Sequence, residues 1–340
     1  MQLPSINNFT FDLTNLALKK ITIVTHKNPD GDAIGSSMGL YFFLKKISPL
    51  VNVVVPNELP EFLKWMPDTN KILVFETQNR QAKAALEQAE VIFCLDFNAM
   101  HRMGEDMGGF VQKLSPAFYL IDHHEMPDNF ANYIFSDTSY GSTCEMVLDV
   151  ILKSDKSDLI DAKIATCLYT GIVTDSGSFR FPKTTAATHE KVSILLQTGI
   201  DNAAIHNQLF NGNSYNSLQL LGKALQNLQM VTSKVSYIAL SHQELNEFHY
   251  QKGDTESIVN YGLSIKGVMM TAFFMENVAE KIIKISFRSV GNFDVNQFAR
   301  KHFNGGGHKN AAGGKSTLSL SETILLFQQT ISQYPELCTS

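Results

Sequence analysis

Short apolar, β-branched runs alternate with helical patterns along the first half of the chain, and this alternation constrains the fold most. The runs cover residues 20–25, 51–55, 71–75, 90–95 and 118–121. Strands that are apolar along nearly their whole length are typical of a parallel sheet, because helices cover both of its faces. Helical patterns at about 33–46, 142–152 and 161–172 fit such helices. Residues 1–187 are therefore predicted to form an α/β domain with a parallel sheet flanked by helices.

The last third of the chain has a different pattern. Strands are predicted at residues 235–240, 268–275 and 282–287, with helices at 296–301 and 321–333. This order indicates a smaller α/β domain with a mixed sheet, and a chain of 340 residues has the length of two ordinary domains. We expect a helical linker over residues 188–230, the second domain over 231–340, and an active-site cleft between the two domains.

Composition and charge narrow the class of protein. The chain is 44% hydrophobic and 18% charged, as folded globular proteins are. Its formal net charge is −5, whereas proteins that grip long nucleic acid usually display a large basic excess. A nucleic-acid substrate should therefore be short and held by a few specific groups, which argues against long duplex DNA.

The location predicted from the sequence is the cytoplasm, with no membrane contact. No segment approaches the ~18 apolar residues needed to span a bilayer, and the first residues lack the features of a signal peptide. Cys94, Cys144, Cys167 and Cys338 are widely spaced, so neither a disulfide nor a zinc site is expected.

Acidic and histidine residues follow the ends of several predicted strands, where open α/β sheets place their ligands. They are His26, Asp30 and Asp32 after the first strand, Asp96 after the fourth, Asp122, His123 and His124 after the fifth, and Asp175 after a later helix. Carboxylates converging on one cleft would repel one another, and two divalent cations would cancel that repulsion. Mixed histidine and carboxylate ligation favours Mn²⁺, with Mg²⁺, Co²⁺ or Fe²⁺ as alternatives. Two adjacent metals suit in-line displacement at phosphorus.

Taken singly, each of these groups has an ordinary structural explanation. His26 could simply end a strand, Asp30 and Asp32 could form a turn, and Asp96 could be a loop or cap residue. Their coincidence at successive strand ends of one domain favours a functional cluster.

Together these residues resemble the four-motif signature of the DHH phosphoesterase superfamily, in the right order and over the whole first domain. The resemblance implies that His26, Asp30 and Asp96 hold one metal. It implies that a second metal is held by Asp32, Asp96, His123 and Asp175. It further implies that His124 contacts the substrate phosphate or the leaving oxygen, and that Asp122 supports the site without binding metal.

A glycine-rich segment gives the second domain its own signal. Gly305, Gly306 and Gly307 precede His308, and glycines let backbone N–H groups approach an anion closely. Arg288, followed by Ser289, suits bidentate phosphate contact, although a flexible loop with a surface arginine would look the same. The combination resembles the DHH-associated C-terminal domain, which implies that Arg288, Ser289 and residues 305–308 bind the substrate.

The pairing of both domains is similar to the bifunctional oligoribonuclease and pAp phosphatase family, the nanoRNases, over nearly the whole chain. That resemblance implies hydrolysis of oligoribonucleotides of two to five nucleotides to mononucleotides, and of 3′-phosphoadenosine 5′-phosphate (pAp) to AMP. The partners implied are short single-stranded oligoribonucleotides and small nucleotides, and a homodimer is an allowed assembly.

Other functions stay open at this point. A phosphodiesterase of linear or cyclic dinucleotides (pApA, cyclic di-AMP) would use the same chemistry, and a manganese pyrophosphatase shares the first domain. A non-catalytic nucleotide or RNA sensor would be marked by missing metal ligands, whereas all six candidates are present here.

A few further residues keep more than one interpretation. Arg102 and Arg180 could reach the cleft or form ion pairs within the fold. Residues 141–143 are expected to start a helix, Asp294 is expected to cap one, and Lys309 is expected to be solvated.

Overall fold

The computed structural model describes residues 16–251, 253–255 and 257–338. The chain divides into two compact units, with the boundary between Gly212 and Asn213. The expected linker, residues 188–230, is shared between them: its first two helices belong to the first unit and its third helix belongs to the second.

The first unit is built on a parallel sheet of six strands in the order β3-β2-β1-β4-β5-β6. The strands are β1 (Ile21–Val24), β2 (Val51–Val55), β3 (Leu73–Val74), β4 (Val91–Leu95), β5 (Ala117–Asp122) and β6 (Tyr133–Ser136). Chain order reverses beside β1, whose neighbours are β2 and β4. Such a switch point leaves a crevice at the carboxyl ends of the strands, which is where open α/β sheets bind their ligands.

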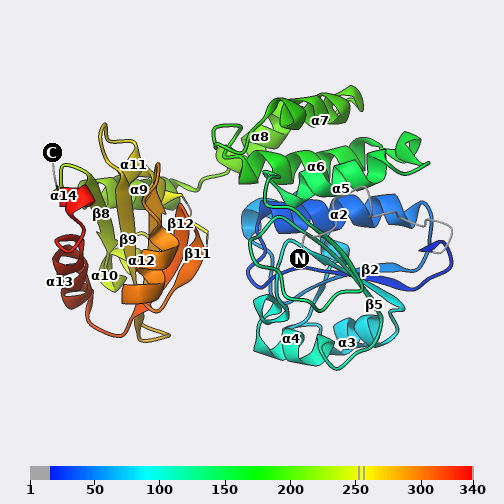
Figure 1. Ribbon diagram of the computed structural model, residues 1–340, viewed down its shortest axis with the longest axis horizontal. Coiled ribbons are helices and arrows are strands. Elements are labelled where there is room, and N and C mark those ends of the chain that lie inside the picture. The colour runs from blue at the N-terminus through cyan, green and yellow to red at the C-terminus, as the bar shows by residue number, and fades with distance from the viewer. Residues whose placement is uncertain (1–15, 252, 256, 339–340) are drawn as a thin grey trace. The chain divides into compact units, whose positions relative to one another are not determined.

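Helices cover both faces of this sheet, as Figure 1 shows with α2, α5 and α6 on one side and α3 and α4 on the other. The helices are α2 (Gly31–Lys45), α3 (Asn79–Glu87), α4 (Glu105–Val111), α5 (Thr143–Leu152), α6 (Ala162–Asp175), α7 (Ala186–Gln197) and α8 (Asn202–Phe210). Short 3₁₀ turns lie at Glu61–Leu63, Thr69–Lys71, Met100–Met103 and Ser157–Leu159. The predicted parallel sheet flanked by helices is confirmed.

Three glycines spaced four residues apart let α2 lie directly against α6. A Cβ at Gly35 would come within 2.6 Å of the Cys167 carbonyl oxygen, and one at Gly39 would overlap Leu168. At the start of α2, a Cβ at Gly31 would overlap the side chain of Thr174 near the end of α6. This contact brings the first turn of α2 to the last turn of α6.

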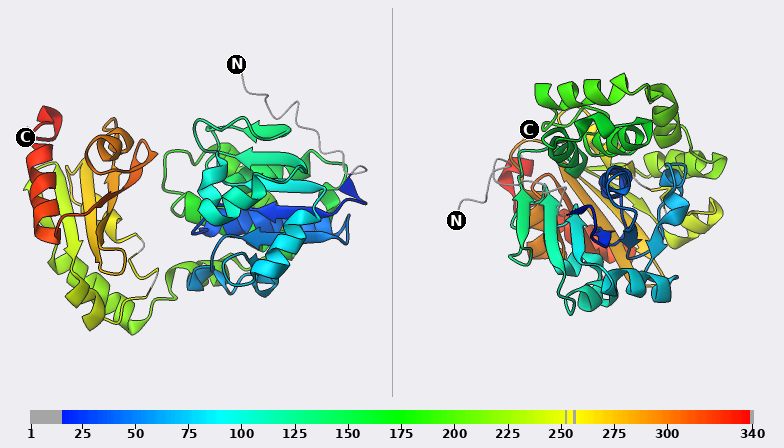
Figure 2. Two further views of the ribbon diagram at one scale, coloured as in Figure 1. Left: turned by 90° about the horizontal axis from the view of Figure 1, so that it is seen from below. Right: turned by 90° about the vertical axis from the view of Figure 1, so that its right-hand side faces the viewer.

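The second unit has a mixed sheet of six strands in the order β11-β12-β10-β9-β8-β7. Its strands are β7 (Gln229–Thr232), β8 (Val235–Leu240), β9 (Met270–Asn277), β10 (Ile282–Ser289), β11 (Gly306–His308) and β12 (Ala311–Ser316). Its helices are α9 (Tyr215–Gln226), α10 (His242–Glu247), α11 (Ile258–Leu263), α12 (Val295–His302), α13 (Leu320–Ile331) and α14 (Pro335–Cys338). Among the described residues of this unit, β8 and β9 pair in parallel and the other neighbouring strands are antiparallel, so the predicted mixed sheet is confirmed. Figure 2 gives two further views of this unit, coloured from green to red.

The two faces of the second sheet are covered unequally. One face packs its apolar residues, including Ile285 and Phe287 of β10, against α12 and α13. On the other face α9, α10 and α11 pack against β8 and β9, and α11 also lies close to β10. Over β10, β11 and β12 this second face carries small, polar and basic residues, all half-buried or exposed: Lys284, Ser286, Arg288, Gly306, His308, Ala311, Gly313 and Lys315. We call these three strands on this side the open half of the sheet.

Candidate active site

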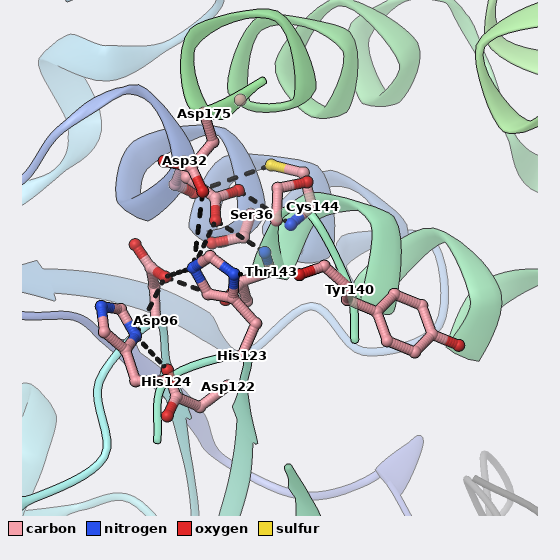
Figure 3. Close-up of polar contacts among 12 residues, drawn as sticks. Asp32, Ser36, Asp96, Asp122, His123, His124, Tyr140, Thr143, Cys144 and Asp175 are labelled. Carbon is pink, nitrogen blue, oxygen red and sulfur yellow. Dashed lines mark hydrogen bonds and ion pairs between the residues drawn. The ribbon is translucent and has the colours of Figure 1, made fainter. Parts of the chain in front are cut away.

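The predicted acidic and histidine residues come together at the carboxyl edge of the first sheet, at its switch point. β1, β4 and β5 are neighbours in the sheet, so the segments that follow them start side by side. His26 follows β1, Asp96 follows β4 directly, and His123 follows β5. Figure 3 shows most of these side chains pointing toward one another.

The first turn of α2 contributes two carboxylates. Asp30 is the N-cap of α2, and its Oδ1 accepts hydrogen bonds from the backbone N–H of Asp32 and Ala33 at 3.1 and 3.0 Å. Its other oxygen, Oδ2, lies 3.9 Å from His26 Nε2. Asp32 is buried, and Asp175 reaches the same cluster from the last residue of α6.

The candidate ligand atoms form two groups that share Asp96. His26 Nε2 lies 3.5 Å from Asp96 Oδ2 in one group. His123 Nε2 lies 3.5 Å from Asp96 Oδ1 in the other, and 3.9 and 3.4 Å from the Oδ2 atoms of Asp32 and Asp175. Three triads bring one ligand atom per residue within 4.8 Å of one another: His26, Asp30 and Asp96; Asp32, His123 and Asp175; and Asp96, His123 and His124. Asp96 therefore presents one oxygen to each of two groups that could hold a metal.

Asp96 takes its place through an uncommon backbone conformation. Its φ is 65°, in the left-handed region that few residues other than Gly, Asn and Asp adopt. Its N–H still donates to Ile121 O at 3.1 Å, so sheet bonding continues to the strand end. The chain turns at this one residue, which sends the carboxylate into the cluster.

The first turn of α5 holds two of these carboxylates and was not predicted to do so. Thr143 N and Cys144 N donate to the two oxygens of Asp32 at 2.6 and 2.8 Å. Thr143 Oγ1 donates to Asp96 Oδ1 at 2.9 Å. The predicted helix start is confirmed, since Ser142 is the N-cap of α5. The sequence carries the signal for the helix cap. Nothing in the sequence tells which carboxylate accepts from the first backbone amides of that helix, which have no partner within the helix.

Burial and the neighbouring charges shift the pKa values of the carboxyl groups in the cluster. Burial raises the pKa of Asp175 to about 7, with Asp30 and Asp96 adding to the effect and His123 opposing it. Burial, then Asp96 and Asp175, raise the pKa of Asp32 well above its usual range, while the two α5 amides favour its charged form. The pKa of Asp96 is instead held well below its usual range, because hydrogen bonds from both histidines outweigh burial.

The histidines titrate in the opposite sense. Burial lowers the pKa of His26, but Asp96 and Asp30 outweigh it and raise the value to about 9. Burial likewise lowers the pKa of His123, and the surrounding carboxylates, Asp96 first, raise it to about 10. Without a cation, this site therefore balances its carboxylates by holding protons.

His124 and Asp122 form a pair beside the two groups. His124 Nδ1 donates to Asp122 Oδ1 at 2.7 Å, and Asp122 is fully buried. The bond fixes the ring orientation and directs Nε2 away from Asp122. The His124 ring meets that of His123 edge to face, with centroids 4.9 Å apart.

In the second unit, the glycine-rich segment forms a strand pair and not an open loop. β11 pairs with β12, and a Cβ at Gly305 or Gly307 would overlap the backbone of β12. His308 lies opposite Ala311, and Ala311 lies opposite Arg288, so Arg288 and His308 project from the same face with a small residue between them.

Ser289 and Arg288 differ in what they contact. The Ser289 hydroxyl donates to Phe293 O at 2.7 Å and accepts from Asn310 Nδ2 at 2.9 Å, so it holds the turn after β10. Arg288 donates to Phe287 O at 3.0 Å, and burial lowers the pKa of its guanidinium.

The structure also shows the contacts of the residues that the sequence left with more than one interpretation. Asp294 caps α12, as predicted. Arg180 Nε donates to Gly177 O at 2.7 Å, the Arg102 carbonyl accepts from Lys27 N, and the Lys309 carbonyl accepts from Val295 N. Cys94, Cys144 and Cys167 are buried free thiols. Among the described residues, no helix is both long and apolar enough to cross a membrane.

Comparisons with known proteins match both units. The model of the DHH family, N-terminal domain, matches residues 20–172, and that of the DHHA1 domain matches residues 228–334. The bifunctional oligoribonuclease and PAP phosphatase NrnA of Thermus thermophilus is 31% identical, over 86% of this chain and 83% of the relative. The protein of the same name from Bacillus subtilis is 29% identical, over 86% of this chain and 88% of its own length.

A solved structure with high similarity spans both units. It is an exopolyphosphatase-related protein from Bacteroides fragilis, with a TM-score of 0.92 and 39% identity. The match covers 95% of this chain and 96% of that one.

Proposed function

This chain belongs to the family of DHH proteins with a DHHA1 domain, and we propose that it is a metal-dependent phosphoesterase of short oligoribonucleotides and pAp. It would release mononucleotides from oligoribonucleotides of two to five nucleotides and AMP from pAp. The observation that carries the proposal is Asp96, which offers one oxygen to each of two histidine–carboxylate groups.

The donor set fits two divalent cations. Each group joins one imidazole nitrogen to carboxylate oxygens, a mixture that Mn²⁺ accepts well and that Mg²⁺ or Co²⁺ also accepts. We propose His26, Asp30 and Asp96 as one ligand set, and Asp32, Asp96, His123 and Asp175 as the other. When bound, the two cations activate water and neutralise charge on the phosphoryl oxygens.

The chain's own side chains supply the remaining steps. We propose that His124 contacts the phosphate or the leaving oxygen through Nε2, because Asp122 engages its other nitrogen at 2.7 Å. Asp122 acts through His124 and is a positioning residue. Thr143 and the α5 amides hold Asp32 and Asp96 in place before substrate arrives, which reduces the reorganisation that catalysis requires.

The open half of the second sheet supports a role in nucleotide binding. Arg288 and His308 flank Ala311, and the next row holds only small residues, Ser286, Gly313 and Gly306. An anion can approach such a surface closely, and a guanidinium can bind it at two points. We propose that Arg288, His308 and the segment of Gly305, Gly306 and Gly307 bind a substrate phosphate, with Ser289 holding the adjoining turn. The amides of Gly305 and Gly307 already donate to Ala299 O and Asn296 Oδ1 at 3.2 and 3.0 Å, so these glycines would act through the close approach that they allow.

Two other functions remain as alternatives to this proposal. A linear or cyclic dinucleotide phosphodiesterase would use the same metal centre, so only substrate choice separates it. A non-catalytic sensor is disfavoured because all six candidate ligands meet in two groups. We also propose a cytoplasmic location, which the buried free thiols support because they suit a reducing compartment.

The test is a Mn²⁺-dependent hydrolysis panel on the purified chain, with an Asp96→Ala variant as control. The substrates are pAp, a diribonucleotide, a pentaribonucleotide, a long oligoribonucleotide, cyclic di-AMP and pyrophosphate. Fast turnover of pAp and the diribonucleotide, with the long oligomer and pyrophosphate nearly intact, supports the proposal. Preference for pyrophosphate, cyclic di-AMP or the long oligomer refutes the substrate assignment. Tight nucleotide binding without turnover indicates a sensor.

A further inference from the structure

The segment from Tyr140 to the first turn of α5 contacts three candidate metal ligands. The Tyr140 carbonyl accepts a hydrogen bond from His123 Nδ1 at 3.4 Å, which leaves Nε2 directed at the neighbouring carboxylates. The α5 turn bonds Asp32 and Asp96 directly, as described above. We call residues 140–145 the ligand-holding turn. Its position decides where three ligands lie.

On its other side, this turn is tied to α7 by a buried ionic cluster. Lys191 Nζ lies 3.3 Å from Asp149 Oδ2 and 3.7 Å from Glu145 Oε2. Tyr140 Oη donates to the same Asp149 oxygen at 2.7 Å, and Lys191 Nζ sits 5.0 Å from the centroid of the Tyr140 ring. The side chains of Lys191 and Glu145 are only 11% and 4% exposed, so solvent screens this cluster little.

The cluster is placed so that it constrains the turn at both ends. Tyr140 begins the turn and Glu145 ends it, and both contact Lys191. A Cβ at Gly141 would lie 2.7 Å from Glu145 Oε1, so the Glu145 carboxylate also fills the space beneath the turn. A buried charge tolerates little displacement from its partners, because each then loses its compensation. Lys191 thus fixes the turn without being part of it.

We infer that Lys191, through Glu145, Asp149 and Tyr140, is a positioning residue for the metal centre. The inference rests on the proposed metal site and adds to it a structural support that reaches α7. Groups that orient metal ligands without binding the metal themselves commonly influence the metal affinity, and their loss weakens metal binding by about 10–100-fold. Here that support is ionic and lies one helix away from the ligands.

The test is a Mn²⁺ titration of the full chain, followed by the loss of the free-ion electron paramagnetic resonance signal. Lys191→Met keeps the length of the side chain and removes its charge. We expect at least one Mn²⁺ dissociation constant to rise about 10–100-fold. Lys223→Met is the matched control, since Lys223 of α9 also joins two helices, reaching Glu244 of α10 at 3.4 Å, and lies in the second unit, away from the candidate ligands of the first. Its Mn²⁺ affinity should equal that of the unmodified chain.

A second pair of variants keeps the inference testable if Lys191→Met fails to fold. Tyr140→Phe removes only the hydroxyl bonded to Asp149, and Thr143→Val removes only the hydroxyl bonded to Asp96. Both should weaken Mn²⁺ binding, and Thr143→Ser, which keeps the hydroxyl, should restore it. Circular dichroism identifies the folded variants in each case.

The outcomes separate the two proposals. If the unmodified chain binds no Mn²⁺, the proposed function fails and this inference fails with it. If the unmodified chain binds Mn²⁺ and folded Lys191→Met or Tyr140→Phe binds it equally well, the inference alone is overturned. Weaker binding in those variants but not in Lys223→Met supports it.

Discussion

Replacement of Gly35 by Ala tests how the α2–α6 contact positions the metal ligands. The new Cβ would lie 2.6 Å from Cys167 O, where ordinary contact begins at 3.4 Å. It would also lie 3.0 Å from both Cys144 Sγ and Gly171 N. Relief of the closest overlap alone requires about 0.8 Å of movement between α2 and α6, because backbone atoms cannot rotate away as a side chain can.

That movement separates Asp32, on α2, from Asp175, on α6. Metal sites need ligand distances to be correct within about 0.2 Å, and misplacement by ~1 Å can cost about 100-fold in rate. Overpacking costs about 1–3 kcal/mol of folding stability, while Ala in place of a helical Gly returns ~1 kcal/mol. The net loss of about 0–2 kcal/mol corresponds to a fall of at most about 8 °C in Tm. We therefore expect activity to fall much further than stability.

The assay compares kcat/KM on a diribonucleotide, Mn²⁺ affinity, and thermal unfolding. Gly109→Ala is the control, because Gly109 lies in α4 of the same unit and its Cβ would meet no atom within 4 Å. It should leave activity unchanged and raise stability by about 0.5–1 kcal/mol. Activity of Gly35→Ala within about twofold of the unmodified chain would refute the reasoning, as would a loss explained by unfolding alone.

Three further predictions concern the site itself. Asp96→Asn keeps the shape of the side chain and suits the left-handed backbone. It should abolish hydrolysis of every substrate and weaken Mn²⁺ binding at both metal positions. If calorimetry shows that the variant loses only one metal, Asp96 is not shared between the two positions. Arg288→Ala should raise KM for the diribonucleotide and spare bis-p-nitrophenyl phosphate, and equal loss on both contradicts its assignment to substrate binding. Mn²⁺ affinity should fall as pH drops, by about tenfold per proton per pH unit, because the pKa values of His26 and His123 are about 9 and 10 and protons must leave before metal binds. Below pH 7, protonation of Asp175 adds to this loss, and titrations in two buffers of different ionisation enthalpy count the protons released.

The sheet of the first unit could be predicted because its strands are apolar on both faces. Such runs mark central parallel strands directly, and β2 occupies residues 51–55 as expected. Edge strands carry a weaker signal. β6 was not predicted, since Tyr133 is half exposed and Asn132 interrupts the run.

The glycine-rich part of the second unit shows a different limit. β11 and β12 were not predicted as strands, because Gly is depleted in strands and the segment reads as a loop. Their pairing depends on how closely two backbones approach, as Gly305 and Gly307 permit. Close approach is a tertiary property that composition does not reveal.

The ligand candidates were found because each follows a recognisable strand or helix end. The residues that hold those ligands in place were not predicted. Thr143 contacts Asp96, and Lys191 contacts Asp149, only once α5 and α7 have packed in the folded chain. Neither residue stands out by its spacing in the sequence, since Lys191 comes 46 positions after Glu145. The metal-ligand roles stay predictions until metal binding is measured.

The left-handed backbone at Asp96 limits which substitutions a lineage can accept there. Gly and Asn adopt this conformation readily, whereas most side chains, β-branched ones above all, add strain at the end of β4. A relative that lost Asp96 but kept a folded chain would therefore be expected to carry Asn or Gly at this position. In a newly sequenced genome, Asn or Gly at this position would therefore mark relatives that keep the fold without the shared metal ligand, and Asp would mark relatives that keep that ligand.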